Sequence, residues 1–423
     1  MRLRPWPVPS PVGRVPAPGR PVSRAARPIR PRLRPPCPSD GNAPAAGPVT
    51  RRPGAALRAL WRWLAAGLLA LGTSTASAAL PIGRIQLPPG FHIEVLSDDV
   101  PSAREMTLSP KGILYVGSMD GHVYALELRN GRLARLHVLA SGLDMPVGVA
   151  WRDDALYVSA VSSILRYDAI DEHLADPPKP VVVTDALPDS PEHGWKFIAF
   201  GPDGKLYVPQ GAPCNACLVD RDRYAMIGRM NPDGSHYETI ARGVRNTVGF
   251  DWHPRTHELW FTDNGRDLLG DDLPDDKLNR APRVGLDFGF PYCHGGNVPD
   301  PQYGAGHPCS RFTPPVLGLG AHVASLGMRF YTGSMFPPDY RDNLFIAEHG
   351  SWNRSRKVGY RVVRVSVNPD GSAARETVFA QGWLMPDDTE WGRPDDVLPL
   401  PDGSLLISDD YAGAIYRVTW TKP

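Results

Sequence analysis

Polar side chains that could hold an anion and move a proton recur at one position of a repeating pattern in the chain. Each stands about four residues before a short apolar run, and they are Asp144, His193, Arg245, His322 and Arg393. Guanidinium groups bind carboxylates through paired hydrogen bonds, and an imidazole can accept a proton near neutral pH. If the fold brings these positions together, they predict a site that binds an anionic ligand and transfers protons.

The elements that must position these side chains follow from a repeated strand motif. A turn is followed by Leu, then by an aromatic residue or Leu, and then by a β-branched or aromatic residue. Six copies occur, at Leu114, Leu156, Leu206, Leu259, Leu344 and Leu405. Short strands separated by Gly, Pro and Asp turns, recurring roughly every 50 residues, are typical of a β-propeller. We therefore predict an all-β fold, a six-bladed β-propeller over residues 79–423.

Ring closure and the place of the site follow from this architecture. Residues 91–96 form an additional strand, and we expect it to pair with the last blade so that no sheet edge stays open. Equivalent positions in different blades meet at one mouth of the central channel, so the five polar residues should surround one cavity. A competing interpretation is that channel mouths are polar without having a function. No glycine-rich phosphate loop opens a helix after a strand, so nucleotide binding is not indicated.

The composition supports a turn-rich fold and argues against nucleic acid as a partner. The 423 residues include 42 Gly and 47 Pro, which disfavours long helices. The whole chain has 46 basic and 45 acidic residues, but 13 Arg and one Asp of these fall within residues 1–78. Residues 79–423 therefore carry a net charge of −11. A surface of that charge repels a polyanion.

The first 78 residues are typical of a leader that is removed on export. Residues 1–50 are rich in Pro and Arg, and they are either a disordered tail or translated sequence upstream of the true start codon. Residues 51–78 have a basic start, a ten-residue apolar run and the small-x-small site Ala76-Ser77-Ala78. They predict a secretory signal peptide cleaved after Ala78, with an uncleaved anchor as the alternative. We expect an exported protein, periplasmic or secreted, without a membrane span in the mature chain.

Four cysteines remain after the predicted cleavage site. An even number in an exported chain favours two disulfides, and the local spacing favours Cys214–Cys217 and Cys293–Cys309 among the three connectivities. Histidines lie beside the second pair, so a structural zinc site is the alternative, although neither histidine has the usual ligand spacing. Leu218 follows the first pair where a haem c attachment site would have His.

Several segments in order resemble the soluble quinoprotein glucose/sorbosone dehydrogenase family, in particular its sorbosone-dehydrogenase-like branch. The resemblance runs from about Ile85 to Val418. It is carried by Pro191-Glu192-His193-Gly194, Gly201-Pro202-Asp203-Gly204, Gly211-Ala212-Pro213-Cys214, Arg242-Gly243-Val244-Arg245-Asn246, Asp263-Asn264-Gly265-Arg266-Asp267, Glu348-His349-Gly350-Ser351-Trp352 and Gly392-Arg393-Pro394-Asp395-Asp396-Val397. The resemblance implies a six-bladed propeller, bound pyrroloquinoline quinone (PQQ), Ca²⁺ and the oxidation of sugars or related hydroxyl and aldehyde compounds.

The resemblance also implies roles at the reacting centre. His193 matches the catalytic His of the family, which takes the substrate hydroxyl proton while hydride passes to the quinone. Arg245 matches the Arg that polarises the quinone oxygen, where negative charge grows. Asn246 matches a neighbouring cofactor contact. Glu192 occupies a position that is usually acidic in the family, and it either tunes His193 or is merely exposed.

Calcium binding is implied for one loop. The family's protein ligands include backbone carbonyls that match Gly265 and Arg266, and Gly265 also faces the cofactor. The surrounding loop is rich in carboxylates, of which we expect Asp267 and Asp276 to be ligands, since Ca²⁺ takes six to eight oxygens. A solvated acidic loop is the alternative. Lys277 replaces an acid in the family's Asp-Glu-x-Asn pattern, which puts a second, structural Ca²⁺ site in doubt.

The carboxylates of PQQ require cations. Arg393 matches the first Arg of the family's Arg-x-Arg-Asp-Val, but the second Arg is Asp395 here, so that contact is missing. We expect Arg354 or Lys357 to supply the basic partner instead. Trp352 either stacks on the quinone or belongs to the core.

Together these features favour an exported PQQ-dependent dehydrogenase that oxidises a sugar, a sorbosone-like aldehyde or a related polyhydroxy compound. The electrons would pass to an external acceptor, because the sequence has no haem attachment motif. One alternative is a propeller that binds a carbohydrate or protein partner without redox chemistry. Another is a Ca²⁺-dependent lactone hydrolase, which needs carboxylates around the channel, and Arg245 and Arg393 argue against it.

Overall fold

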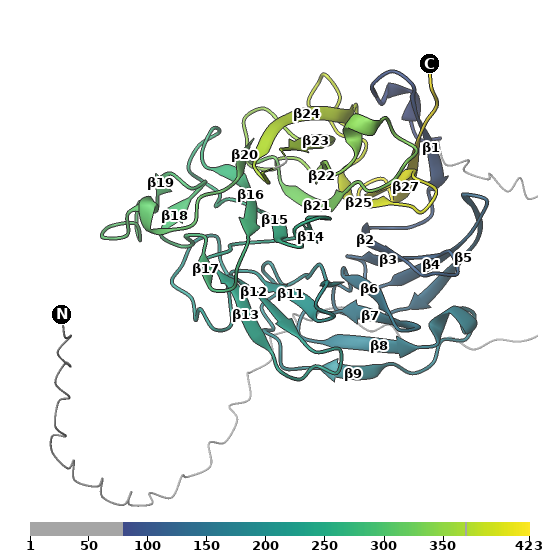
Figure 1. Ribbon diagram of the computed structural model, residues 1–423, viewed down its shortest axis with the longest axis horizontal. Helices are drawn as coiled ribbons and strands as arrows, with labels where there is room; N and C mark the ends of the chain where they lie inside the picture. Colours follow the sequence, from purple (N-terminus) through teal and green to yellow (C-terminus); the bar gives the residue numbers. More distant parts are fainter. Residues whose placement is uncertain (1–78, 369) are drawn as a thin grey trace, which may run out of the picture. The chain divides into compact units, whose positions relative to one another are not determined.

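Six antiparallel sheets stand around a central axis and form a six-bladed β-propeller, as predicted (Figure 1). This is a computed structural model, and it describes residues 79–368 and 370–423. The predicted leader and signal peptide lie outside the described residues, so both stay predictions. No helix among the described residues is long and apolar enough to cross a membrane.

The first three blades follow one another along the chain. Blade 1 is β2 (Ala103–Leu108), β3 (Ile113–Ser118), β4 (Val123–Arg129) and β5 (Arg132–Ala140). Blade 2 is β6 (Val149–Arg152), β7 (Ala155–Ser159), β8 (Ile164–Asp168) and β9 (Val181–Thr184). Blade 3 is β10 (Ala199–Phe200), β11 (Leu206–Gln210), β12 (Met226–Met230) and β13 (Glu238–Arg242), with β17 (Leu286–Asp287) added in parallel to β13.

The other three blades complete the ring. Blade 4 is β14 (Phe250–Trp252), β15 (Leu259–Asp263), β16 (Asp275–Ala281) and β20 (Leu317–Ala321). Blade 5 is β21 (Ser325–Phe330), β22 (Leu344–Glu348), β23 (Arg361–Val367) and β24 (Ala373–Gln381). Blade 6 is β25 (Pro394–Pro399), β26 (Leu405–Asp409), β27 (Ala414–Trp420) and β1 (Phe91–Ser97). Short 3₁₀ turns are η1 (Ile82–Arg84), η2 (Ile170–Glu172), η3 (Cys309–Arg311) and η4 (Pro338–Tyr340).

The repeated Leu motif is the second strand of each blade. In β7, β11, β15, β22 and β26 every residue is buried. These strands lie within a blade that is covered on both faces by the neighbouring blades. They therefore read as continuous apolar runs and do not alternate between apolar and polar residues.

The ring is closed by the N-terminal strand, as predicted. Strand β1 pairs antiparallel with β27, with Phe91 opposite Trp420 and Val95 opposite Tyr416. The last blade thus combines strands from both ends of the described chain, which leaves its outer edge formed by an early segment. This pairing fixes β25, and with it Arg393, relative to blade 1.

Buried carboxylates of the innermost strands join neighbouring blades. Glu105 accepts hydrogen bonds from the backbone amides of Val149 and Ile198, at 3.0 and 2.9 Å. Asp396 accepts one from the amide of Met106 at 3.0 Å. Burial raises the pKa of Glu105 well above its usual value. Because each carboxylate spans from one blade to the next, the loops at the channel are held in fixed relative positions.

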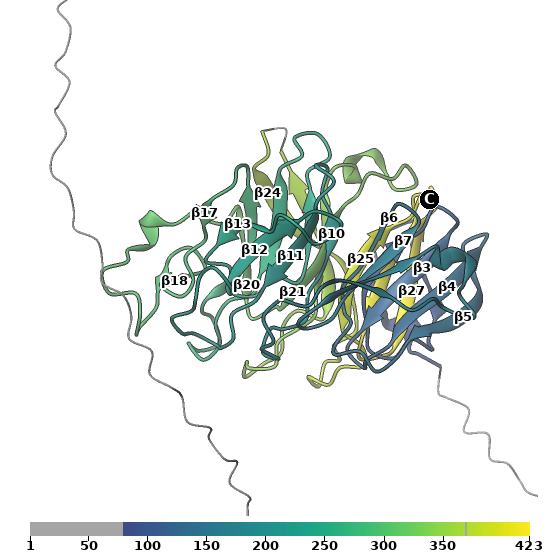
Figure 2. The same ribbon diagram turned by 90° about the horizontal axis from the view of Figure 1, so that it is seen from below.

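Both predicted disulfides are present, Cys214–Cys217 and Cys293–Cys309. The alternative of a zinc site at the second pair is therefore wrong, because both sulfurs are bonded to each other and His294 pairs with Asp300 at 2.9 Å. The second disulfide lies in an insertion between β16 and β20. This insertion also carries β18 (Cys293–His294) and β19 (Val298–Pro299), and it projects away from the ring in both views (Figures 1 and 2).

We predict that removing the second disulfide destabilises the protein more than removing the first. The Cys293–Cys309 bond joins residues 16 apart, whereas Cys214 and Cys217 are three apart. In the chain-entropy model the longer loop corresponds to about 3 kcal/mol of stability and the shorter one to about 2 kcal/mol. Urea unfolding of the two paired Cys→Ser variants measures both values, and equal stability of the Cys293/Cys309 variant and the wild type would refute the prediction.

Candidate active site

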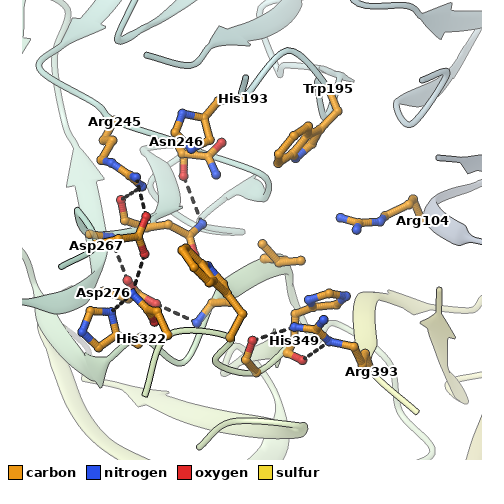
Figure 3. Close-up of a pocket in the computed structure, with 17 residues that line it drawn as sticks. Arg104, His193, Trp195, Arg245, Asn246, Asp267, Asp276, His322, His349 and Arg393 are labelled. Atoms are coloured by element: carbon orange, nitrogen blue, oxygen red, sulfur yellow. Dashed lines mark hydrogen bonds and ion pairs between the residues drawn. The ribbon is translucent and has the colours of Figure 1, made fainter. Parts of the chain in front are cut away.

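A cavity of about 310 Å³ near the axis of the ring receives side chains from five of the six blades. Arg104 comes from β2, His193 and Trp195 from the loop before β10, and Arg245 from the loop before β14. Loops around β21, β22 and β25 contribute further side chains, among them His322, His349, Trp352, Asn353 and Arg393. Figure 3 shows the labelled side chains of this set arranged around one open space.

Four of the five residues predicted to converge do line this cavity: His193, Arg245, His322 and Arg393. The prediction was wrong for Asp144, which is exposed and does not line it. Its backbone carbonyl accepts a hydrogen bond from the amide of Val161, and the next residue, Met145, has φ = 45°. A positive φ does not by itself explain the outcome, because His193 and His322 also have one and do line the cavity. Arg104 of blade 1 is a polar group of the cavity that the prediction did not include.

His193 is a neutral imidazole with one nitrogen free to accept a proton. Its Nδ1 lies 2.7 Å from the carbonyl oxygen of Ala212, and because a carbonyl only accepts, Nδ1 carries the proton and Nε2 does not. Burial, reinforced by the charge of Arg245, lowers the pKa of His193 to about 4. The close approach needs a glycine at position 211, where a Cβ would lie 2.4 Å from the Cβ of His193. The geometry is that of a general base.

We predict that His193 of the apoprotein stays uncharged down to about pH 4. Its pKa of about 4 compares with the usual 6.5, so protonation begins only below pH 5. Nitrogen NMR of ¹⁵N-histidine-labelled protein, with the resonance assigned by its loss in His193→Gln, measures this titration. A His193 midpoint near 6.5 would contradict the prediction.

Arg245 is fixed in the wall of the cavity by a set of acceptors. Its Nη2 lies 3.0 Å from Asp267 Oδ2, and its Nε donates to the carbonyl oxygen of Asn215 at 2.8 Å. The side chain is 5% exposed, so it cannot change its orientation freely. Asn246, which was predicted to contact the cofactor next to Arg245, also lines the cavity. Its backbone N–H donates to Asp263 Oδ1 at 2.9 Å. The guanidinium is thus placed beside His193 before any ligand binds.

The predicted calcium loop borders the cavity with Gly265, Asp267 and Asp276. Asp267 is engaged by Arg245 and by Asn353, whose Nδ2 lies 2.8 Å from its Oδ1. Asp276 accepts hydrogen bonds from the amides of Gly265 and Ala324, at 2.7 and 2.8 Å. Burial raises the pKa of Asp276 to about 6, with these amides acting in the opposite direction. Both carboxylates therefore already have partners.

The backbone carbonyls of Gly265 and Arg266, which were also predicted as ligands, differ from these two carboxylates in their hydrogen bonding. Within the described chain, neither the Gly265 nor the Arg266 carbonyl oxygen accepts a hydrogen bond. The Arg266 side chain is directed away, because it forms an ion pair with Asp300. Gly265 lines the cavity, whereas Arg266, the next residue, does not. A carbonyl oxygen without a protein partner at the cavity wall is the kind of donor that a hard cation such as Ca²⁺ requires.

Arg393 differs from the other cavity arginines because its partners are neutral. Its Nε and Nη2 donate to the carbonyl oxygens of His349 and Gly350, at 3.1 and 2.7 Å. Among residues 79–368 and 370–423 it has no ion pair with a carboxylate. A guanidinium held in place without a direct ion pair is suited to bind a ligand carboxylate.

The remaining predicted cofactor residues lie outside the cavity. Arg354 donates to the carbonyl oxygen of Asp271 at 2.5 Å and pairs with Asp272. Lys357 forms an ion pair with Glu390, and Glu192 is exposed. None of the three lines the cavity, so the expectation that Arg354 or Lys357 replaces the missing second Arg has no support in this geometry.

Sequence reasoning missed several residues that line the cavity, among them Arg104, Trp195 and His349. His349 Nε2 lies 2.8 Å from Asp410 Oδ1, and burial lowers the pKa of His349 to about 4. Arg104 lies on the inner strand itself. The prediction considered only polar residues about four positions before each inner strand, so it did not include Arg104. A search for charged residues inside the apolar inner strands would have found it.

Comparisons with known proteins agree with this fold. The TrAA12-like family model matches residues 85–421. An uncharacterized protein of Borreliella burgdorferi is 34% identical over 351 residues, which cover 80% of this chain and 91% of that protein.

Among solved structures, the calcium structure of the Trichoderma reesei Carbohydrate-Active Enzymes Family AA12 protein has a TM-score of 0.68 at 18% identity, covering 80% of this chain and 97% of that one. The holo form of the pyranose dehydrogenase PQQ domain from Coprinopsis cinerea has a TM-score of 0.66 at 18% identity, over 79% and 97% of the two chains. The PQQ-bound aldose sugar dehydrogenase from Streptomyces coelicolor has a TM-score of 0.56 at 21% identity, over 79% and 99%. At these identities the likeness shows a shared fold.

Proposed function

Because this chain belongs to the TrAA12-like family of PQQ-dependent sugar dehydrogenases, we propose that it is a PQQ-dependent oxidoreductase. Its substrate in this proposal is a sugar, a sorbosone-like aldehyde or a related polyhydroxy compound. The observation that carries the proposal is the cavity itself. A neutral His193 with a free Nε2 and three guanidinium groups, those of Arg104, Arg245 and Arg393, line one space.

The residues present fit the cofactor. PQQ carries three carboxylates, and the cavity offers fixed cations, of which Arg393 forms no direct ion pair within the described chain. The Gly265 carbonyl, which has no hydrogen-bond partner in the described chain, fits Ca²⁺ beside it, and Asp267 and Asp276 would add negative charge nearby. Similar structures include a PQQ-bound form and a calcium form, which supports this pair of ligands.

In this proposal, three residues of the chain have separate roles in the reaction. Bound PQQ supplies a quinone carbonyl that accepts a hydride. His193 Nε2 takes the proton of the substrate hydroxyl, since that nitrogen is unprotonated above pH 4. Arg245, held by Asp267 and Asn215, stabilises negative charge on the oxygen that faces it. Asn246 supports the same wall of the cavity.

Trp352 belongs to the mouth of the site. It is 70% exposed yet lines the cavity, so it is not a core residue. Its neighbours Ser351 and Asn353 are fixed by hydrogen bonds, to Val358 and Asp267 respectively. An exposed indole on a fixed loop is suited to stack on the ring of an incoming sugar.

Export and electron transfer complete the proposal. The two disulfides fit an oxidising compartment such as the periplasm or the exterior. Electrons would leave to an external acceptor at the open mouth of the cavity.

Reconstitution tests the proposal directly. Apoprotein is mixed with PQQ and Ca²⁺, and binding is followed by the quinone absorption and by the rise in the temperature of unfolding. Reduction of an artificial acceptor is then measured with a panel of aldoses and sugar aldehydes. Binding of PQQ with turnover supports the proposal. Absence of PQQ binding favours a propeller without redox chemistry.

A further inference from the structure

Arg104 joins the first blade to the last at the edge of the cavity. Its Nη1 lies 2.9 Å from Asp395 Oδ2, and its Nη2 lies 2.5 Å from Asp410 Oδ2. Asp395 is on β25 and Asp410 follows β26, so both carboxylates come from blade 6. Asp410 is held in turn by His349 at 2.8 Å. The guanidinium is thus clamped from two sides.

The clamp leaves part of the guanidinium available to a ligand. Arg104 lines the cavity, its side chain is 10% exposed, and each of its two terminal nitrogens has a second N–H besides the one used in an ion pair. In Figure 3 the group points into the open space between Trp195 and His349. A carboxylate that enters this space can accept hydrogen bonds from the remaining N–H groups.

The residue at position 395 indicates why the cofactor would need the cation of Arg104. The family that the sequence resembles has a second Arg there, whereas this chain has Asp. Asp395 is 2% exposed and lies within ion-pair distance of Arg104. A guanidinium is therefore present beside position 395, but it comes from the neighbouring blade.

We propose that Arg104 supplies the second cation for the carboxylates of PQQ, with Asp395 and Asp410 as the positioning residues that hold it. This inference rests on the proposed function. It replaces the expectation that Arg354 or Lys357 takes this role, since both are paired elsewhere and lie outside the cavity.

A metal ion in the same cluster is disfavoured. One ligand atom each of His349, Asp395 and Asp410 lies within 4.8 Å of the others, a spacing that could hold a cation. The Arg104 guanidinium already occupies that position as the counter-charge of both carboxylates.

The test compares the PQQ affinity of variants in which Arg104 and Asp395 are replaced. Arg104→Met/Asp395→Asn removes both charges together and leaves Asp410 paired with His349. We expect its dissociation constant for PQQ, measured by absorption in the presence of Ca²⁺, to rise about 10- to 100-fold. Arg104→Lys keeps the charge but loses the planar fork, so a several-fold rise is expected. If the double variant does not fold, the dissociation constant of Arg104→Lys for PQQ tests the proposal.

A matched control removes a similar pair elsewhere in blade 6. Arg417→Met/Asp402→Asn eliminates an ion pair of 2.6 Å that does not line the cavity, and PQQ affinity should stay within twofold of wild type. If the Arg104 variants are folded and bind PQQ as tightly as wild type, Arg104 is only a clamp between blades and the inference is wrong. Failure of the wild type to bind PQQ would instead overturn the proposed function.

Discussion

Replacing His193 by Gln is expected to lower turnover by about 10²- to 10⁴-fold while PQQ stays bound. In free energy this is about 3–5 kcal/mol added to the barrier. The reason is the free Nε2, which is the proton acceptor and which an amide cannot replace. Turnover is measured after reconstitution with excess PQQ and Ca²⁺, and cofactor occupancy is checked by absorption in the same sample.

His322 provides the contrast for this measurement. It lines the same cavity, but its Nε2 donates to the carbonyl oxygen of Gly270 at 2.8 Å and its Nδ1 lies 3.3 Å from Asn353. Neither nitrogen is free to take a substrate proton, so His322→Gln should lose much less turnover. Equal losses in both variants, or near-normal turnover of His193→Gln with PQQ bound, would remove the assignment of the base.

The fold was predictable because its signal is repeated. Six copies of the Leu motif are the six second strands, and their continuous apolar character follows from burial on both faces. Ring closure by residues 91–96 was predictable because an unpaired strand at the start of a repeat array needs a partner. The insertion that carries β18 and β19 and the parallel strand β17 has no such repeat, so its position could not be predicted from the sequence.

The site was predictable where residues stand at the same offset in each blade. His193, Arg245, His322 and Arg393 follow that rule and converge. Asp144 follows it too, but its side chain is exposed and does not line the cavity. The offset alone does not determine where a side chain points, since left-handed residues at this turn include His193 and His322, which do line the cavity.

Ion pairs that join different blades were the other feature that could not be predicted from the sequence. Asp395 reads as a lost cofactor contact when blade 6 is considered alone. Only the contact across the closure of the ring pairs it with Arg104, which is 291 positions earlier in the chain. Arg354 and Lys357 were plausible because they follow the His349-Gly350 segment, yet their partners on neighbouring loops hold them away from the cavity.

Replacing Arg393 by Ala is expected to weaken PQQ binding by about 10²- to 10³-fold and to change turnover at saturating PQQ far less. The carboxylate that it would bind is present both before and after hydride transfer, so its loss affects binding and not the barrier. The effect should exceed that of the Arg104 variants. Arg104 forms ion pairs with two carboxylates, whereas the hydrogen bonds of Arg393 go to the carbonyl oxygens of His349 and Gly350.

The measurement is a titration of apoprotein with PQQ at fixed Ca²⁺, followed by turnover at saturation. Lys357→Ala is the matched control, because it removes a nearby cation that is paired with Glu390 and does not line the cavity. An unchanged dissociation constant in Arg393→Ala would show that its guanidinium only supports the loop around His349. A loss of turnover as large as the loss of affinity would show that Arg393 acts on the developing charge, which would move it from cofactor binding to catalysis.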